Sequence, residues 1–182
     1  MIMKNFLTTI IACLCTLQLA AQTRPEFLGL PISGNTKTAF AEKLIEKGYK
    51  YFGENDGYIM YSGQFLGCDA FAMLIPSGHD DGITGVHVSL SELNPMKMGQ
   101  LFSELQQKFM KKYADYKYTT DVTPNGGTDV IFRKSTPSGL MDYVAIKSKV
   151  QGASCDLSIT YGVDMKDDTA SSDGGGIGID DI

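Results

Sequence analysis

The clearest pattern of apolar positions in this chain runs from Asn94 to Tyr113 and predicts an amphipathic helix. Asn94 can cap the first turn, and Pro95 suits the first helical position, where no backbone N–H donor is needed. Because such a helix must bury its apolar stripe, it requires another element to pack against. The stripe recurs at steps of three and four residues: Met98, Leu101, Phe102, Leu105, Phe109 and Tyr113.

A shorter helix is predicted from about residue 37 to residue 47. Gly34-Asn35-Thr36 interrupts the chain before it and offers a cap, and Gly48 suits the left-handed position that ends a helix. Each predicted helix is followed by a series of strand-like segments. The apolar positions of this helix are Phe40, Ala41, Leu44 and Ile45.

Most of the remaining chain alternates apolar and polar residues, which predicts strands. Residues 155–163 alternate most regularly, whereas residues 68–75 are apolar on both faces, as in a central, covered strand. We therefore predict an α+β fold, with two helices packed on one side of an antiparallel sheet. The predicted strands are residues 49–52, 58–65, 68–75, 83–90, 116–122, 129–134, 140–150 and 155–163.

The order of one helix and four strands occurs twice, which suggests a tandem α-β4 duplication with halves at residues 36–91 and 94–163. Short sequence matches between the halves favour this interpretation. They are only two or three residues long, so chance similarity remains the alternative. The matches are Tyr49-Lys50-Tyr51 with Tyr116-Lys117-Tyr118, and Cys68-Asp69 with Cys155-Asp156.

The first residues have the pattern of a secretory signal peptide, residues 1–21. Lys4 supplies the positive charge, residues 6–19 the apolar core, and cleavage is predicted after Ala21. The alternative is a lipoprotein signal with Cys13 as the lipidated residue. The chain is therefore predicted to be exported, either periplasmic or secreted. No later apolar run is long enough for a transmembrane segment in the mature chain.

The composition of the two ends differs from that of the domain between them. Residues 22–35 are predicted to form an extended N-terminal segment, residues 36–163 the α+β domain, and residues 164–182 a disordered acidic tail. The net charge of −5 and the absence of a basic stripe argue against a nucleic-acid partner.

Local catalytic and cofactor motifs are missing from the sequence, so no cofactor is predicted. The weak candidates for a metal or catalytic site are His79, Asp80 and Asp81 in the loop at residues 77–82. Their spacing matches no zinc pattern, and a solvated turn is the simpler interpretation. Of the cysteines, Cys68 and Cys155 remain after the leader, and an oxidising compartment permits a disulfide between them. Two free thiols are the alternative.

Tyrosines are frequent in the predicted strands, and strands place alternate residues on opposite faces. Tyrosine buries a large area at low entropic cost, which suits a recognition surface. The leading hypothesis is therefore a non-enzymatic binding module whose partner is a protein or an envelope component, with its oligomeric state left open. An envelope hydrolase or metal-dependent enzyme and a structural lipoprotein are the alternatives. The candidate binding residues are Tyr49, Tyr51, Tyr58, Tyr116 and Tyr118.

The leader and three further segments, residues 27–34, 46–49 and 63–68, resemble a group of uncharacterised small secreted bacterial proteins. The order of helix and strands, given twice, also resembles the beta-lactamase inhibitor protein and its relatives. That resemblance implies two halves whose sheets present a concave face to a partner protein. This chain differs by having one predicted helix in each half, and no binding residue carries over by motif.

Overall fold

The computed structural model describes residues 23–78, 81–124 and 126–165, without the side chains of 151, 164 and 165. The predicted signal peptide, Cys13 and nearly all of the predicted acidic tail lie outside these residues. The two predicted helices are present as α2 (Lys37–Glu46) and α3 (Pro95–Lys112). Neither helix has the length and apolar character needed to cross a lipid bilayer.

The helix boundaries follow the predicted caps. The Thr36 hydroxyl accepts a hydrogen bond from the Ala39 amide at 3.1 Å, and the Asn94 side-chain oxygen accepts one from the Lys97 amide at 2.8 Å. Each bond satisfies an amide that has no partner within its helix. Gly48 has a φ of +84°, so the chain leaves α2 through a left-handed residue.

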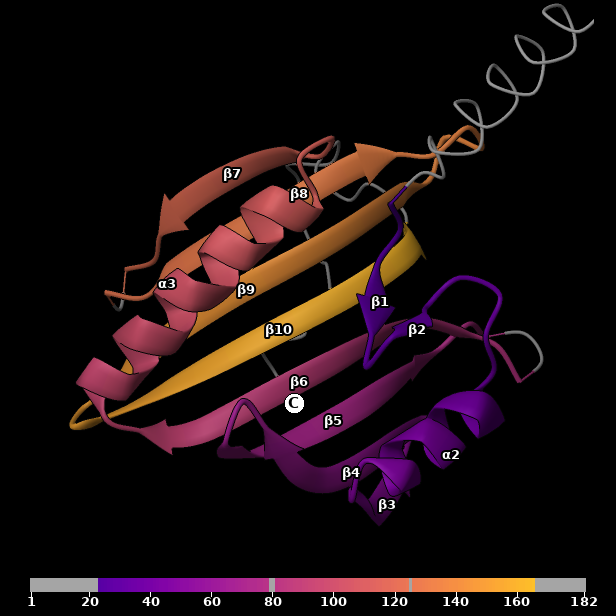
Figure 1. The fold of residues 1–182 in the computed structure, drawn as a ribbon, viewed down its shortest axis with the longest axis horizontal. Coiled ribbons are helices and arrows are strands. Elements are labelled where there is room, and N and C mark those ends of the chain that lie inside the picture. The colour runs from indigo at the N-terminus through magenta and orange to yellow at the C-terminus, as the bar shows by residue number, and fades with distance from the viewer. Residues whose placement is uncertain (1–22, 79–80, 125, 166–182) are drawn as a thin grey trace, which may run out of the picture.

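Eight strands form one fully antiparallel sheet in the order β3-β4-β5-β6-β10-β9-β8-β7 (Figure 1). Each half of the chain supplies four consecutive strands, and the last strand of each half, β6 or β10, lies at the centre. The strands are β3 (Lys50–Asn55), β4 (Tyr58–Phe65), β5 (Cys68–Pro76), β6 (Ile83–Leu93), β7 (Lys117–Val122), β8 (Thr128–Ser135), β9 (Met141–Gln151) and β10 (Ser154–Met165).

The repeated element order is therefore present, while gene duplication as its origin stays a prediction. Only one of the two sequence matches lies at equivalent positions in the two halves of the fold. Lys50 and Lys117 are the first residues of the two edge strands, β3 and β7. Cys68 instead begins the third strand of its half, and Cys155 lies in the fourth strand of the other.

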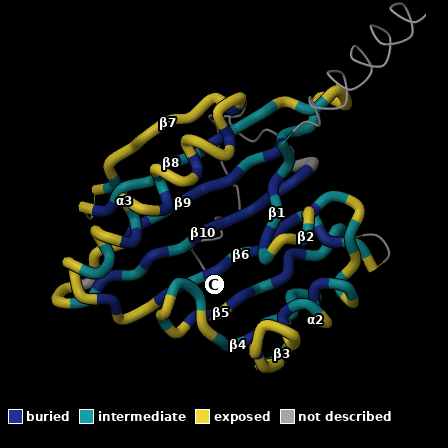
Figure 2. The backbone as a smooth tube through the Cα atoms, viewed as in Figure 1, coloured by how far each residue is buried: buried dark blue, intermediate teal, exposed yellow. Residues whose placement is uncertain are grey.

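The sheet has one covered face and one uncovered face. Directly paired residues on neighbouring strands of an antiparallel sheet point to the same face. A row of such partners across the sheet therefore lists residues that share one face. Both helices lie on the face that carries the row listed below, and we call this the covered face (Figures 1 and 2). Among the described elements, no helix or strand lies over the opposite, uncovered face. The buried row is Tyr61, Ala72, Val88, Ile159, Ile146 and Val130.

The segment predicted to be extended forms a short hairpin, β1 (Glu26–Phe27) and β2 (Leu30–Pro31), which lies between the two helices on the covered face (Figure 1). We call residues 23–35 the N-terminal arm. The Phe27 ring packs against Phe65 of β4, with centroids 5.7 Å apart, and against Tyr161 of β10 at 5.6 Å. The arm therefore joins the cores of the two halves.

Tyr49, the residue before β3, is buried, and its hydroxyl has no hydrogen-bond partner among the described residues. Burial raises the pKa of the Tyr49 phenol from 10.0 to about 12. The unfolded chain loses this proton at lower pH, so the free energy of unfolding should fall as the pH rises from 10 towards 12. Urea unfolding at pH 9 to 12 checks this: Tyr49→Phe should flatten the decline, and an unchanged decline in the variant would contradict it.

Candidate binding surface

The uncovered face carries a group of apolar side chains on β3, β4 and β5, which we call the aromatic patch: Phe52, Met60, Phe71 and Met73. Met60 and Met73 are direct cross-strand partners. The register between β3 and β4 shifts between Tyr51 and Gly53, which places Phe52 in a bulge. Its ring meets the Phe71 ring edge-on, with centroids 5.2 Å apart and planes at 75°.

Both rings of the patch are open to solvent, with 61% of Phe52 and 42% of Phe71 exposed, while the two methionines are half-buried. By contrast, the rings packed between the covered face and the elements above it, such as Phe27, Phe40 and Phe132, are nearly inaccessible. A contiguous apolar patch on a soluble protein commonly marks an interaction surface. Contact with a partner would remove this area from water, which is favourable in proportion to the area buried.

The uncovered face becomes polar towards its centre. Met73 pairs with His87, whose Nδ1 lies 2.9 Å from the Thr160 hydroxyl. His87 faces away from its neighbours Val86 and Val88, which are buried on the covered face. The row that begins at Phe71 continues through polar and charged residues to the far edge of the sheet. Its members are Ser89, Ser158, Lys147, Asp129 and Asp121.

The five candidate tyrosines do not form one cluster on the uncovered face. Tyr49 and Tyr116 are buried, with 3% and 6% of their surfaces exposed. Tyr51 and Tyr118 are 59% and 51% exposed, but they lie on the covered face at opposite edges of the sheet. Only Tyr58, which is half-buried, alternates with Met60 onto the uncovered face.

The physical reason is the position of the helices. Tyr49 and Tyr116 immediately precede the edge strands, where the chain returns from each helix to the sheet, so their rings fold inward. The Tyr49 ring fills the space above Gly63, where a Cβ atom would approach the ring to 2.5 Å. Tyr51 and Tyr118 face the same side as their partners Tyr61 and Phe132.

Sequence reasoning missed Phe52 and Phe71. Strict alternation cannot reveal a bulge, so the ring of Phe52 could not be assigned to a face. Phe71 lies in the segment that was interpreted as a covered strand because both of its faces are apolar. In a sheet with helices on one side only, the same observation requires apolar side chains on the uncovered face. That signal was present in the sequence.

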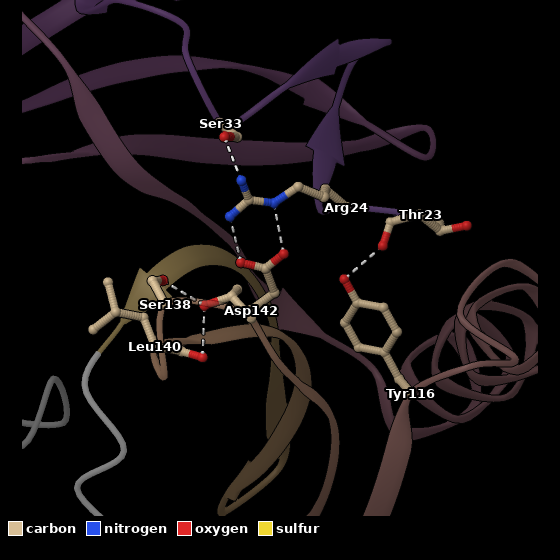
Figure 3. Close-up of polar contacts among 8 residues, drawn as sticks. Thr23, Arg24, Ser33, Tyr116, Ser138, Leu140 and Asp142 are labelled. Atoms are coloured by element: carbon tan, nitrogen blue, oxygen red, sulfur yellow. Dashed lines mark hydrogen bonds and ion pairs between the residues drawn. The ribbon is translucent and has the colours of Figure 1, made fainter. Parts of the chain in front are cut away.

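On the covered face, a polar network fastens the N-terminal arm to the second half (Figure 3). The Arg24 guanidinium donates two hydrogen bonds of 2.7 Å to the Asp142 carboxylate and one of 2.6 Å to the Ser33 hydroxyl. The Tyr116 hydroxyl donates to the Thr23 carbonyl oxygen at 2.8 Å. These hydrogen bonds join residues of the arm to Asp142 and Tyr116 of the second half, so the network is a structural anchor for the arm.

The weak candidates in the 77–82 loop are described only in part, because His79 and Asp80 lie outside the described residues. The Asp81 carboxylate accepts a hydrogen bond from the Thr38 hydroxyl at 2.9 Å, and its carbonyl accepts one from the Lys37 amide at 2.7 Å. Asp81 thus supports the start of α2. Within the described ranges, His, Cys, Asp and Glu residues form no group of three or more that could hold a metal ion.

The structure leaves Cys68 and Cys155 as free thiols, the first half-buried and the second buried. Their strands, β5 and β10, are separated by β6. Two strand spacings amount to about 10 Å, whereas a disulfide needs Cα atoms within about 7 Å of each other. The disulfide considered from the sequence is therefore absent here, because a strand lies between the two cysteines.

Comparison of the chain with protein families, with curated proteins and with solved structures found no match. The resemblance to the beta-lactamase inhibitor protein, which was based on element order, thus stays a prediction.

Proposed function

We propose that this chain is an exported binding module that holds a partner protein on the uncovered face of its sheet, with the aromatic patch at the centre of the contact. The observation that carries the proposal is the exposed edge-on pair of Phe52 and Phe71. Aromatic side chains are enriched at protein–protein interfaces and dominate their energetics. Methionines beside them add an adaptable apolar surface.

The chemistry of the patch favours a protein partner with protruding apolar side chains. Small ligands bind mainly in concave sites that enclose most of their surface, whereas Phe52 and Phe71 stand on an open sheet. Export is supported by the charged, apolar and small-residue pattern of residues 1–21. The lipoprotein alternative depends on Cys13, and the enzyme alternative on the 77–82 loop, where Asp81 is engaged with α2.

The test replaces both rings by serine, Phe52→Ser with Phe71→Ser, in the full chain. The immobilised wild-type protein and the variant are exposed to envelope extract, bound proteins are identified, and the dissociation constant of a purified partner is measured. We expect the double variant to weaken binding by at least about tenfold, because hot-spot aromatic residues each contribute on this scale.

Tyr118→Ser is the matched control, since Tyr118 is an equally exposed aromatic residue on the covered face. It should bind the partner as the wild type does. If the double variant keeps the wild-type affinity, or if Tyr118→Ser loses as much, the aromatic patch is not the contact surface.

A further inference from the structure

Two positive charges face each other at the far edge of the uncovered face. Lys117 of β7 and Arg133 of β8 are direct cross-strand partners. Lys117 alternates with Tyr118 of the covered face, so both cations project from the uncovered face. Like charges directly opposite each other destabilise a sheet. The row continues to the uncharged Tyr143, so no carboxylate compensates this pair within its described row.

The same two strands provide an internal comparison. Four residues further along β7, Asp121 faces Asp129 in a pair of like negative charges. That row continues to Lys147 of β9, whose Nζ lies 4.0 Å from the Asp129 carboxylate. The negative pair is therefore compensated by a cation on the neighbouring strand. The equivalent position beside Arg133 is filled by a tyrosine.

The two cations line an open hollow of about 470 Å³. Its wall also includes Thr119, whose hydroxyl can donate a hydrogen bond. Asp115 and Lys134, at the rim, form an ion pair with each other. The hollow thus combines three cations with one carboxylate, in a chain whose net charge is −5. This local excess of positive charge is opposite in sign to the net charge of the whole chain.

We infer that this hollow is a binding site for a small, doubly charged tetrahedral oxyanion, such as inorganic phosphate or a phosphate monoester. Two opposed cations match a charge of −2, and a guanidinium presents a planar fork of donors to phosphate oxygens. Binding would also relieve the repulsion between Lys117 and Arg133. The inference is independent of the proposed function, because it rests on other residues at the opposite edge of the sheet.

Isothermal titration calorimetry of the full chain at low ionic strength tests the site, with inorganic phosphate as the probe. We expect saturable binding to the wild type. Lys117→Gln and Arg133→Gln should each weaken it by about tenfold or more, since each removes a charge-assisted contact. Without phosphate, Lys117→Gln should be at least as stable to heat as the wild type, because the repulsion is gone.

Lys50→Gln is the matched control, since Lys50 begins β3 as Lys117 begins β7 but faces the uncharged Ser62. It should bind phosphate like the wild type. Tighter binding of glucose 6-phosphate than of inorganic phosphate would assign the site to a monoester, and the reverse to the free anion. Absence of saturable binding, equal binding by Lys117→Gln and wild type, or equally tight binding of acetate would overturn the inference.

Discussion

Replacing Phe27 by alanine should lower the free energy of unfolding by about 3–5 kcal/mol, the range for removing a buried phenylalanine. Phe27 is 1% exposed and contacts one aromatic ring from each half of the sheet. The arm around it is short, and its strands contain two residues each. The rings that contact Phe27 belong to β4 and β10, which are both paired within the sheet, so little of the cost should be recovered by relaxation. Urea unfolding followed by circular dichroism measures the change.

Phe52→Ala is the matched control because it removes the same side chain from an exposed position. Its effect on stability should stay within about 0.5 kcal/mol, as for most surface substitutions. Phe27 and Phe52 lie on opposite faces of the sheet, so the two variants also separate folding from binding. Equal losses of stability at the two positions would contradict the assignment of Phe27 to the core and Phe52 to a free surface.

The helices could be predicted from the sequence because their determinants are local. A cap at Asn94, a proline at the next position and an apolar stripe at steps of three and four all lie within one segment. The same is true of Thr36 and of Gly48, which bound α2. The eight strands were also recognisable, since alternation and turn residues are local signals.

The order of the strands and the assignment of faces could not be predicted, because they depend on contacts between distant residues. The central pair of β6 and β10 joins segments about seventy residues apart in the chain. The bulge at Phe52 arises from the pairing of β3 with β4, and the sequence pattern of β3 alone does not predict it. Tyr51 and Tyr118 were candidates for the free face, and only the register with Tyr61 and Phe132 shows that they share the helix side.

The N-terminal arm shows how a non-local partner gives a residue its role. In the sequence, Arg24 is one charged residue in an extended segment, and nothing near it identifies Asp142 as its partner, 118 positions away. Alternation places Asp142 on the same face as Val144 and Ile146, where a carboxylate needs a partner, but it does not identify that partner. The guanidinium that the arm brings to it compensates its charge.

Arg24→Ala should consequently destabilise the fold by about 3 kcal/mol, the lower end of the range for breaking a buried ion pair. The Asp142 side chain is 4% exposed, and without Arg24 its charge would remain buried with less compensation. The lower end applies because the Arg24 side chain is 30% exposed, so water screens part of the interaction. Chemical denaturation at pH 7 measures the loss.

Two further variants distinguish two causes of this loss of stability: the buried charge of Asp142 and the loss of the contacts that anchor the arm. Arg24→Lys keeps the charge but cannot form the paired bonds to both carboxylate oxygens, so its loss should be intermediate. Arg24→Met combined with Asp142→Leu removes both charges and should recover most of the stability lost in Arg24→Ala, because the desolvation cost disappears with the pair. If the double variant were as unstable as Arg24→Ala, the buried charge of Asp142 would not be the cause of the loss, which would then come from other contacts of Arg24, such as its hydrogen bond to Ser33.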